Sequence, residues 1–306
     1  MSSGIRLGAT VVRLPPGPDA RVYALLGDPV AHSLSPAMQQ AALDALGLAG
    51  VYVACRVVAA DLAGVFEDLR ALAAQDRLGG VNVTVPHKTA VVRWLDACDA
   101  GAGAAGAVNT ICVQRDGVTP LFRGFNTDLE GLVRVLVDAG VALHGARVVI
   151  VGAGGMGRAA ATAAFRAGAA EVFVAARHEP RAQDMLDAIS RAWRGALPAL
   201  GCGSFAAAEA RLASADVLVH ATPLGLHPDD GVAVALDRAS TRLFVCDTVY
   251  GPGPTPLVRA AQARGLRSID GRALLLHQGA AAFTLWTGLE APLAVMRAAL
   301  AGPHGP

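Results

Sequence analysis

Short apolar runs, each closed by a glycine, a proline or a polar residue, recur through the first half of the chain. They predict buried strands at residues 22–27, 51–57 and 80–86. Between these strands, residues 35–46 and 61–74 carry apolar side chains at helical spacing, and Ser35 followed by Pro36 is typical of an N-cap and a first helical position. The order strand, helix, strand, helix, strand predicts a parallel α/β layer covered by helices.

The second half of the chain repeats this kind of pattern. It predicts a helix at residues 129–139 and strands at residues 147–151, 171–176, 216–220 and 243–246. These runs do not alternate between apolar and polar residues, which is typical of strands buried on both faces of a parallel sheet. We therefore predict two α/β domains, residues 1–127 and 128–271, with the C-terminal helices of residues 272–306 packing back onto the first.

The composition is typical of a folded protein with a large core. Of 306 residues, 53% are hydrophobic and 17% are charged, and the net charge of +1 gives no electrostatic reason to expect a nucleic-acid or membrane partner. The N-terminus does not resemble a signal peptide and no apolar run is long enough to cross a membrane, so the expected location is cytoplasmic. Scattered cysteines without a CxxC pair predict free thiols rather than disulfides or a metal site: Cys55, Cys98, Cys112, Cys202 and Cys246.

The predicted strand at residues 147–151 runs directly into a glycine-rich turn that opens a helix-forming segment. In a G-x-G-x-x-G turn, the first glycine permits the bend, the second lets the backbone approach a pyrophosphate and the third lets the helix pack closely. The first amides of the helix then face the phosphates. We interpret the turn as a dinucleotide site, the alternative being an ordinary strand-to-helix turn. Its residues are Gly152, Ala153, Gly154, Gly155, Met156 and Gly157.

The end of the next predicted strand bears on the choice of cofactor. NAD sites place a carboxylate there to bind the ribose 2′-hydroxyl, whereas NADP sites place an arginine near the 2′-phosphate. Here the strand ends at Ala176, followed by Arg177 and, one helical turn on, Arg181. This favours NADP, although Glu179 keeps NAD open and both arginines could simply be solvated.

Polar residues in the first half gather where a structural role alone would not require them. Asn82 and Thr84 alternate with valines on a predicted strand and would share one face, with Lys88 just beyond. The polar residues 109–110 and 126–128 end two further apolar stretches. Ligand sites in open α/β sheets lie at the carboxyl ends of strands, so these side chains could converge. For each one alone, the alternative is turn chemistry or capping.

These motifs, taken in order, carry a resemblance to a known family. From about Leu26 to Gly288, the chain resembles the shikimate dehydrogenases. Besides the glycine turn, the matching stretches are residues 27–36, 82–88, 106–110, 126–128, 221–225, 247–250, 255–257, 278–280 and 283–288.

The resemblance implies a reversible, NADP-linked oxidation of shikimate to 3-dehydroshikimate in aromatic amino acid biosynthesis. It implies an N-terminal open α/β substrate-binding domain and a Rossmann-type, doubly wound dinucleotide-binding domain. The implied catalytic pair, Lys88 and Asp128, handles the hydroxyl proton while hydride moves to the nicotinamide. Ser33 and Ser35 would bind the substrate carboxylate. The other implied substrate ligands are Asn82, Thr84, Asn109, Asp128, Tyr250 and Gln278. The implied cofactor ligands are the glycine turn and Ala176, Arg177, Arg181, Thr222, Pro223, Val249 and Gly271.

The chain departs from the family pattern at several positions, and two alternative functions remain open. Gln39 and Gln40 stand where the family usually carries histidine and asparagine, a change that would reshape the pocket slightly. One alternative is a quinate/shikimate dehydrogenase that uses NAD or NADP in quinate catabolism; the two serines favour the smaller shikimate. The other is a non-catalytic homologue that binds such a ligand as a sensor. The presence of both Lys88 and Asp128 argues against this alternative. We expect a monomer or homodimer without a metal.

Overall fold

The structure is a computed structural model that describes residues 5–13, 16–227, 230–251 and 253–301. The outer ends of the predicted domain ranges, residues 1–4 and 302–306, lie outside the described residues. The chain divides into two compact units. Unit 1 contains the described residues up to Ala102, residues 107–127 and the described residues from Gln278 on, and unit 2 contains residues 103–106 and 128–277. Among the described helices, none combines the length and the hydropathy needed to cross a membrane.

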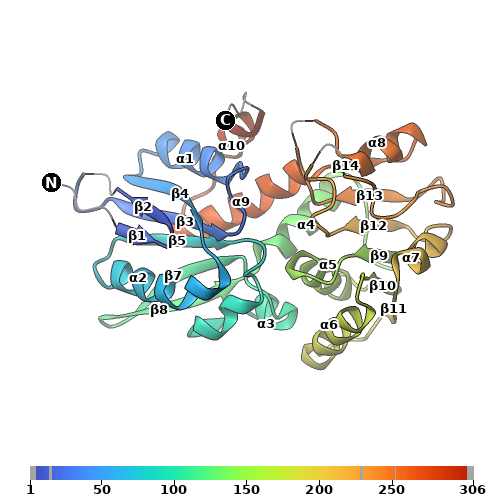
Figure 1. Cartoon of the computed structure of the whole chain (residues 1–306), viewed down its shortest axis with the longest axis horizontal. Coiled ribbons are helices and arrows are strands. Elements are labelled where there is room, and N and C mark those ends of the chain that lie inside the picture. Colours follow the sequence, from blue (N-terminus) through green and yellow to red (C-terminus); the bar gives the residue numbers. More distant parts are fainter. Residues whose placement is uncertain (1–4, 14–15, 228–229, 252, 302–306) are drawn as a thin grey trace. The chain divides into compact units, whose positions relative to one another are not determined.

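Unit 1 is built on a sheet with the strand order β4-β3-β5-β7-β8-β6 (Figure 1). Its strands are β3 (Arg21–Gly27), β4 (Gly50–Arg56), β5 (Leu78–Val83), β6 (Ala97–Cys98), β7 (Thr110–Asp116) and β8 (Thr119–Phe125). A separate hairpin consists of β1 (Ile5–Leu7) and β2 (Thr10–Val12). The helices are α1 (Ser35–Ala45), α2 (Leu62–Ala74), the start of α3 (Ala100–Ala105), the second part of α9 (Gly271–Thr287) and α10 (Leu293–Ala301), with 3₁₀ turns at Ala59–Asp61 and Ala90–Trp94.

Strand β3 shows why this sheet is covered on both faces. Val22, Ala24 and Leu26 belong to a core cluster that includes the buried face of α2, whereas Tyr23 and Leu25 alternate with them and are buried on the other face. Strands β3, β4 and β5 are parallel to one another, which confirms the predicted strand and helix order of the first half.

The sheet is not parallel throughout, because strands β7 and β8 extend the predicted parallel layer in the antiparallel sense. Strand β7 runs antiparallel to β5, and β8 returns antiparallel to β7 through a turn in which Gly117 has a φ of 60°. Asn82 of β5 is paired with Thr110 of β7. Asn109 therefore precedes a strand instead of ending one, yet it lies at the same edge as the end of β5, because the two strands run in opposite directions.

Strand β5 is also shorter than predicted. It ends at Val83, and Thr84 follows the last strand residue, although the Thr84 N–H still donates to the Leu26 carbonyl of β3 at 2.8 Å. The physical reason is a turn: the His87 N–H donates to the Thr84 carbonyl at 2.9 Å and takes the chain away from the sheet direction.

A tryptophan from α9 fixes the C-terminal segment on the unit 1 sheet. The Trp286 indole N–H donates to the Ile111 carbonyl of β7 at 3.1 Å, and its ring lies 5.5 Å from that of Tyr23. A Cβ atom on Gly80 of β5 would lie 2.3 Å from the indole, so only glycine leaves room for the ring.

Unit 2 is an all-parallel sheet with the strand order β11-β10-β9-β12-β13-β14. Its strands are β9 (Arg147–Val151), β10 (Glu171–Ala175), β11 (Ala199–Gly203), β12 (Val217–His220), β13 (Phe244–Asp247) and β14 (Ser268–Ile269). Its helices are α4 (Thr127–Asp138), which starts at the unit boundary, α5 (Gly155–Arg166), α6 (Glu179–Ala192), α7 (Phe205–Arg211), α8 (Pro256–Ala263) and the first part of α9. This doubly wound order confirms the predicted Rossmann-type fold.

Both faces of the unit 2 sheet are apolar, as predicted from its strands. Val148 and Ile150 of β9 join a core with α4, α5 and α6, and Val149 and Val151 join a second core with α7 and α8 (Figure 1). All four valine and isoleucine side chains are buried, which is the burial expected of a central parallel strand.

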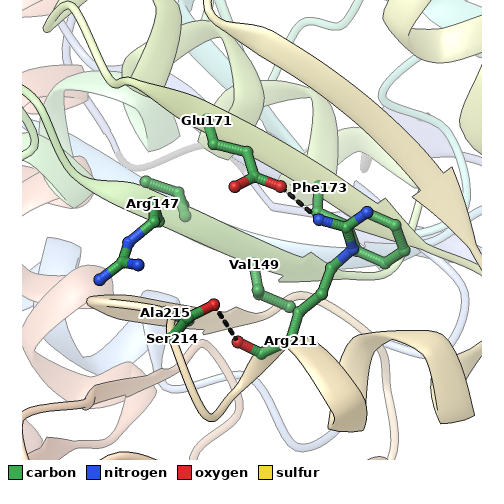
Figure 2. A pocket seen from close by; sticks show the side chains of 8 residues that line it. Arg147, Val149, Glu171, Phe173, Arg211, Ser214 and Ala215 are labelled. Atoms are coloured by element: carbon green, nitrogen blue, oxygen red, sulfur yellow. Dashed lines mark hydrogen bonds and ion pairs between the residues drawn. The ribbon is translucent and has the colours of Figure 1, made fainter.

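The amino edge of this sheet is closed by ion pairs between its own side chains. Figure 2 shows Arg211 of α7 paired with Glu171 at the start of β10. The Arg211 guanidinium lies over the Phe173 ring, 4.2 Å from the ring centre. Arg147, at the start of β9, pairs with Asp216 at 3.3 Å. Because these charges compensate one another, the small cavity between them does not present an unpaired charge to a ligand.

The contact between Gly80 and Trp286 predicts a marked difference between two glycine substitutions in unit 1. Gly80→Ala should lower the free energy of unfolding by about 1–3 kcal/mol, because the new methyl group overlaps the indole and the packed site cannot expand freely. Gly64→Ala is the matched control, since Gly64 lies exposed in α2 and its Cβ would meet no described atom within 4 Å.

Gly64→Ala should raise stability by up to about 1 kcal/mol through helix propensity. Urea denaturation of both variants measures these changes. Equal stability of Gly80→Ala and the wild type would show that Trp286 is not fixed against this strand.

Candidate functional site

The end of β5 in unit 1 carries a buried amide that joins three strands. The Asn82 side-chain N–H₂ donates to the Asn109 carbonyl and to the Thr110 hydroxyl, each at 3.1 Å. Its oxygen accepts from the Tyr52 hydroxyl of β4 at 2.8 Å. Asn82 is 5% exposed, so these bonds satisfy both ends of a buried amide, as burial of a polar group requires.

Asn109 extends this network to α4 and α9. Its side-chain N–H₂ donates to the Thr127 hydroxyl at 3.0 Å and to the Gln278 side-chain oxygen at 3.4 Å. Its oxygen accepts from the Thr127 backbone N–H at 2.7 Å. The structure thus brings Asn82, Asn109 and Gln278 together, although 196 positions in the numbering separate the first from the last. Both side-chain N–H groups of Asn82 and of Asn109 already have acceptors in this network, so a polyhydroxylated ligand would have to share or replace some of these bonds.

The start of α1 differs from the predicted cap but keeps its serines close together. The helix begins at Ser35 itself and Leu34 occupies the N-cap position, so Ser35 is not the N-cap as predicted. Instead, the Ser33 hydroxyl accepts from the Ser35 backbone N–H at 3.2 Å. The physical reason is that this bond satisfies a first-turn amide from outside the helix, a task that an N-cap side chain would otherwise perform.

Two hydrogen bonds to the backbone of other segments hold the chain at residues 87 and 88. The Lys88 carbonyl accepts from the Val108 N–H at 2.8 Å, which ties it to the residue before Asn109. His87 is 1% exposed and its Nε2 lies 2.6 Å from the Val57 carbonyl, so this histidine has a structural partner. Thr84 packs its methyl group over Gly27, where a Cβ would lie only 2.3 Å from it.

Gln39 has a larger part in this unit than its motif position suggested. It is 1% exposed, and its side-chain N–H₂ donates to the Gly279 carbonyl of α9 at 2.9 Å. Gly279 follows Gln278, so Gln39 helps to fix the segment that carries this candidate ligand. Sequence reasoning singled out the departure at Gln39 but could not find its partner, because helices α1 and α9 are far apart in the chain.

In unit 2, the glycine turn has no room for side chains at two of its positions. Gly152 has a φ of 120°, and its Cβ would lie 2.6 Å from the Ala221 carbonyl oxygen. A Cβ on Gly157 would lie 1.9 Å from the Gly152 carbonyl oxygen. At Gly154, by contrast, a Cβ would meet no described atom within 4 Å. The turn is therefore closely packed at Gly152 and Gly157 and open at Gly154. The first amides of α5, which follow Gly154, have no acceptor within their helix.

The end of β10 presents two exposed arginines beside this turn. Ala176 follows the strand, and its backbone N–H donates to the Gly203 carbonyl at 3.1 Å. Arg177 comes next, and Arg181 lies in the first turn of α6, whose N-cap is His178. Both guanidinium groups are solvent-exposed at the sheet edge that carries the glycine turn.

The remaining candidates of unit 2 follow β12 and β13 or begin α4. Thr222 is half-buried and Pro223 exposed, just beyond β12. The Val249 carbonyl accepts from the Gly271 N–H at 2.8 Å, and a Cβ on Gly271 would lie 2.3 Å from the Thr248 carbonyl oxygen. Tyr250 is half-buried beyond β13. Asp128, 4% exposed, is in the first turn of α4, where the helix dipole favours a carboxylate.

The cysteines form no disulfide among the described residues. Burial raises the pKa of Cys55 to about 11 and that of Cys112 to about 12. Burial and the neighbouring Asp247 charge raise the pKa of Cys246 to about 12. These thiols are protonated at neutral pH and are poor nucleophiles. In the described part of the chain, no cluster of three or more His, Cys, Asp or Glu side chains could hold a metal ion.

Comparison with known proteins gives matches in both units of the chain. Residues 25–111 match the shikimate dehydrogenase substrate binding domain, residues 135–228 match shikimate / quinate 5-dehydrogenase, and residues 271–301 match the shikimate 5′-dehydrogenase C-terminal domain. The chain is 43% identical over 276 residues to an NADP⁺ shikimate dehydrogenase of Moorella thermoacetica, covering 90% of both chains. The chain belongs to the shikimate dehydrogenase family.

Solved structures of this family have the same fold over almost the whole chain. A shikimate dehydrogenase of Thermus thermophilus, in complex with NADP(H) and shikimate, is 35% identical with a TM-score of 0.78, over 92% of this chain and 98% of that one. A quinate dehydrogenase of Corynebacterium glutamicum, in complex with NAD, is 33% identical with a TM-score of 0.81, over 92% and 99%. The overall α/β fold expected from the resemblance is thus confirmed.

The geometry of the glycine turn predicts opposite behaviour for two single-methyl substitutions. Gly154→Ala should fold normally, because its methyl group has space, but that space is where a pyrophosphate would approach the backbone. We expect its dissociation constant for NADP⁺ to rise at least about tenfold, which corresponds to about 1.4 kcal/mol.

Gly157→Ala should instead lose thermal stability, because its methyl group collides with the Gly152 carbonyl. Calorimetric titration and thermal denaturation measure the two effects separately. Unchanged NADP⁺ affinity in a folded Gly154→Ala variant would exclude this turn as the phosphate site.

Proposed function

We propose that this protein catalyses the reversible, NADP-dependent oxidation of shikimate to 3-dehydroshikimate, as an enzyme of aromatic amino acid biosynthesis. Unit 1 is proposed to bind shikimate and unit 2 to bind NADP. The observation that carries the proposal is the hydrogen-bond network that links the buried Asn82 and Asn109 to the half-buried Gln278. This network lies, in a member of this family, at the edge of the sheet where Lys88 follows. Amide side chains of this kind suit the ring hydroxyls of shikimate.

We assign the substrate ligands in line with this chemistry. Ser33 and Ser35, close together at the start of α1, would donate to the substrate carboxylate. The remaining proposed substrate ligands are Asn82, Thr84, Asn109, Asp128, Tyr250 and Gln278.

Lys88 is the proposed proton carrier, and the basic residues of the whole chain support this role. Of the 26 lysine and arginine residues in the sequence, Lys88 is the only lysine. An arginine stays protonated in proteins, whereas a lysine amine can lose and regain a proton. A chain that uses arginine for every other basic side chain keeps lysine where a proton transfer requires it.

The reaction requires a proton to leave the substrate hydroxyl as hydride leaves the same carbon. Bound NADP⁺ supplies the hydride acceptor. In the proposed mechanism, the Lys88 amine accepts the hydroxyl proton during oxidation and returns it to the carbonyl oxygen during reduction. The Asp128 carboxylate orients Lys88 and accepts a hydrogen bond from the hydroxyl. The two residues are thus proposed to act as one acid–base unit.

The cofactor proposal rests on the fit of the unit 2 turn to a dinucleotide. The open side of Gly154 leaves space for a pyrophosphate, and the arginines at the end of β10 provide positive charge for a 2′-phosphate. The proposed ligands are Gly152, Ala153, Gly154, Gly155, Met156, Gly157, Ala176, Arg177, Arg181, Thr222, Pro223, Val249 and Gly271.

Oxidation of quinate, with NAD or NADP, is the second candidate function. The observation that favours it is the similarity to a quinate dehydrogenase in complex with NAD. Quinate carries an additional hydroxyl on the carbon that bears the carboxylate, so the space beside the paired serines decides between the substrates. One hydroxyl changes selectivity strongly only where a polar group is placed to read it.

The proposal also includes a cytoplasmic location and a monomeric or homodimeric enzyme. A net charge of +1 supports the absence of nucleic-acid or membrane partners. Light scattering from the purified protein tests the oligomeric state against the chain mass of 31.1 kDa, and a mass above twice this value would contradict it.

The central test is steady-state turnover with shikimate and NADP⁺, followed by the absorbance of reduced nicotinamide, with quinate and NAD⁺ assayed in parallel. Wild type should turn over shikimate with NADP⁺ fastest. Lys88→Met should lower kcat by about 10²- to 10⁴-fold, because the variant retains the length of the side chain but cannot carry a proton.

Thermal denaturation of Lys88→Met checks that it folds. Higher kcat/KM for quinate would move the enzyme to the second candidate function, and a Lys88→Met variant with wild-type kcat would contradict the proposed role of Lys88. A wild type that turns over neither substrate with either cofactor would support a ligand-binding sensor.

Cofactor preference is tested at the arginines after β10. Arg177→Ser combined with Arg181→Ser should raise KM for NADP⁺ by about 10- to 100-fold, which corresponds to about 1.4–2.8 kcal/mol for the two side chains together. Each charge-assisted hydrogen bond contributes less than a buried one would, because both side chains are solvent-exposed. KM for NAD⁺ should change less than about threefold, because NAD⁺ has no 2′-phosphate for these side chains to bind.

Arg191→Ser is the matched control, as Arg191 lies exposed in the last turn of the same helix. The prediction is wrong if the double variant loses affinity for NADP⁺ and NAD⁺ by the same factor.

A further inference from the structure

A buried histidine–aspartate pair lies at the carboxyl edge of the unit 2 sheet. His220 is the last residue of β12 and Asp247 the last of β13, and the two are direct partners in the parallel register. The His220 Nδ1 lies 2.8 Å from Asp247 Oδ1, and each residue is 1% exposed. Neither residue was predicted to be functional: His220 was seen only as the end of an apolar strand, and Asp247 only as the first residue of a stretch that matches the family.

The carboxylate of Asp247 is surrounded by donors. Besides His220, it accepts from the Val249 backbone N–H at 3.0 Å and from the Thr255 hydroxyl at 2.6 Å. Because an ionised carboxylate can only accept, the hydrogen on the His220 ring that faces it is on Nδ1.

The other ring nitrogen of His220 reaches a loop that faces outwards. Its Nε2 lies 2.5 Å from the Thr222 hydroxyl oxygen, which also accepts from the Leu224 backbone N–H at 3.2 Å. With Nδ1 carrying the ring hydrogen, Nε2 accepts the Thr222 hydroxyl proton. The Thr222 oxygen then has one lone pair left to accept a hydrogen bond from a ligand. The bonds to His220 and to the Leu224 N–H fix the side-chain rotamer of Thr222.

The pair is bonded into the backbone of neighbouring loops as well. Between His220 and Thr222, the Ala221 N–H donates to the Val151 carbonyl at 2.8 Å, directly before Gly152. Val249 is held at both ends, since its N–H donates to Asp247 and its carbonyl accepts from Gly271. The pair therefore fixes the positions of the loops after β12 and β13 relative to the glycine turn.

The loops after β12 and β13 and the arginines after β10 lie on opposite sides of the central strand β9. Strand β9 lies between β10 on one side and β12 on the other, so the strand order reverses at β9 and forms a switch point. A dinucleotide bound across this switch point with its adenosine ribose at the end of β10 extends its nicotinamide half over β12 and β13.

We propose that His220 is a positioning residue for the nicotinamide half of NADP. It links the Asp247 carboxylate to the Thr222 hydroxyl and so holds Thr222 as a hydrogen-bond acceptor for the carboxamide N–H₂ or the ribose hydroxyls. This inference rests on the proposed function. It assigns cofactor affinity to a buried residue that does not itself touch the cofactor.

The test is a double-mutant cycle on NADP⁺ affinity, measured by calorimetric titration of the full chain. His220→Phe should raise the dissociation constant about five- to twentyfold, because the Thr222 hydroxyl loses the partner that orients it. His220→Gln, which can donate to Asp247 and accept from Thr222, should stay within about threefold of the wild type. Thr222→Val should weaken binding as His220→Phe does, and Thr222→Ser should not.

The two residues should be coupled. In the Thr222→Val background, His220→Phe should change the dissociation constant by less than about twofold, because the link is already cut. KM for shikimate should stay within about twofold in every variant.

A purely structural role for His220 gives a different result. Thr255→Val is the matched control, since it removes another hydroxyl from the same carboxylate, on the side of α8, and has no hydrogen bond to Thr222 in the described residues. It should lower the melting temperature but leave NADP⁺ affinity within about twofold.

The outcomes separate this inference from the proposed function. Equal NADP⁺ affinity in the wild type and in His220→Phe, or effects of His220→Phe and Thr222→Val that multiply in the double variant, would overturn the inference alone. If His220→Phe does not fold, wild-type affinity in Thr222→Val overturns it equally. A wild type that does not bind NADP⁺ would overturn the proposed function as well.

Discussion

In unit 2, the backbone of the glycine turn lies directly against the end of the neighbouring strand. Ala221, at the end of β12, places its carbonyl oxygen where Gly152 would carry a Cβ, and the Gly152 carbonyl fills the same space at Gly157. Because these positions have no side chains, β9 and β12 remain paired up to their last residues, and α5 starts directly after the glycine turn. The loops after β9, β12 and β13 consequently meet at one edge, where the proposed cofactor ligands and the His220–Asp247 pair lie.

Unit 1 reaches a similar concentration of polar groups by a different topology. Its β5 ends where the antiparallel β7 begins, so Asn82 and Asn109 meet although one ends a strand and the other precedes one. The buried amides satisfy each other and are anchored by Tyr52, Thr110 and Thr127. A network satisfied in this way is rigid, and it holds the candidate ligands in place before any substrate arrives.

Much of this organisation could be predicted from the sequence, because it depends on local signals. The apolar runs and the glycine turn predicted the doubly wound sheet of unit 2, with strand β9 at the predicted residues. The β7–β8 hairpin was missed because its strands are amphipathic and carry Arg115 and Arg123. The N-cap at Ser35 and the strand position of Thr84 were wrong because a hydroxyl two residues upstream and a turn at His87 prevailed over local preference.

Contacts between distant segments could not be predicted in this way. His220 and Asp247 are 27 positions apart, and only the register of β12 against β13 makes them partners. Gln39 was noticed only as a departure from the family pattern, since its partner Gly279 lies in another helix. For Lys88, a signal independent of any motif was present, namely a single lysine among 26 basic side chains.

Hydrogen–deuterium exchange with and without NADP⁺ tests most directly the claim that the carboxyl edge of the unit 2 sheet binds the dinucleotide. The account predicts slower exchange in NADP⁺ for the amides of residues 152–158, 221–225 and 248–250, and unchanged exchange at the amino edge, residues 147–148 and 214–216. Protection at the amino edge, or no protection at the loops after β9, β12 and β13, would contradict it.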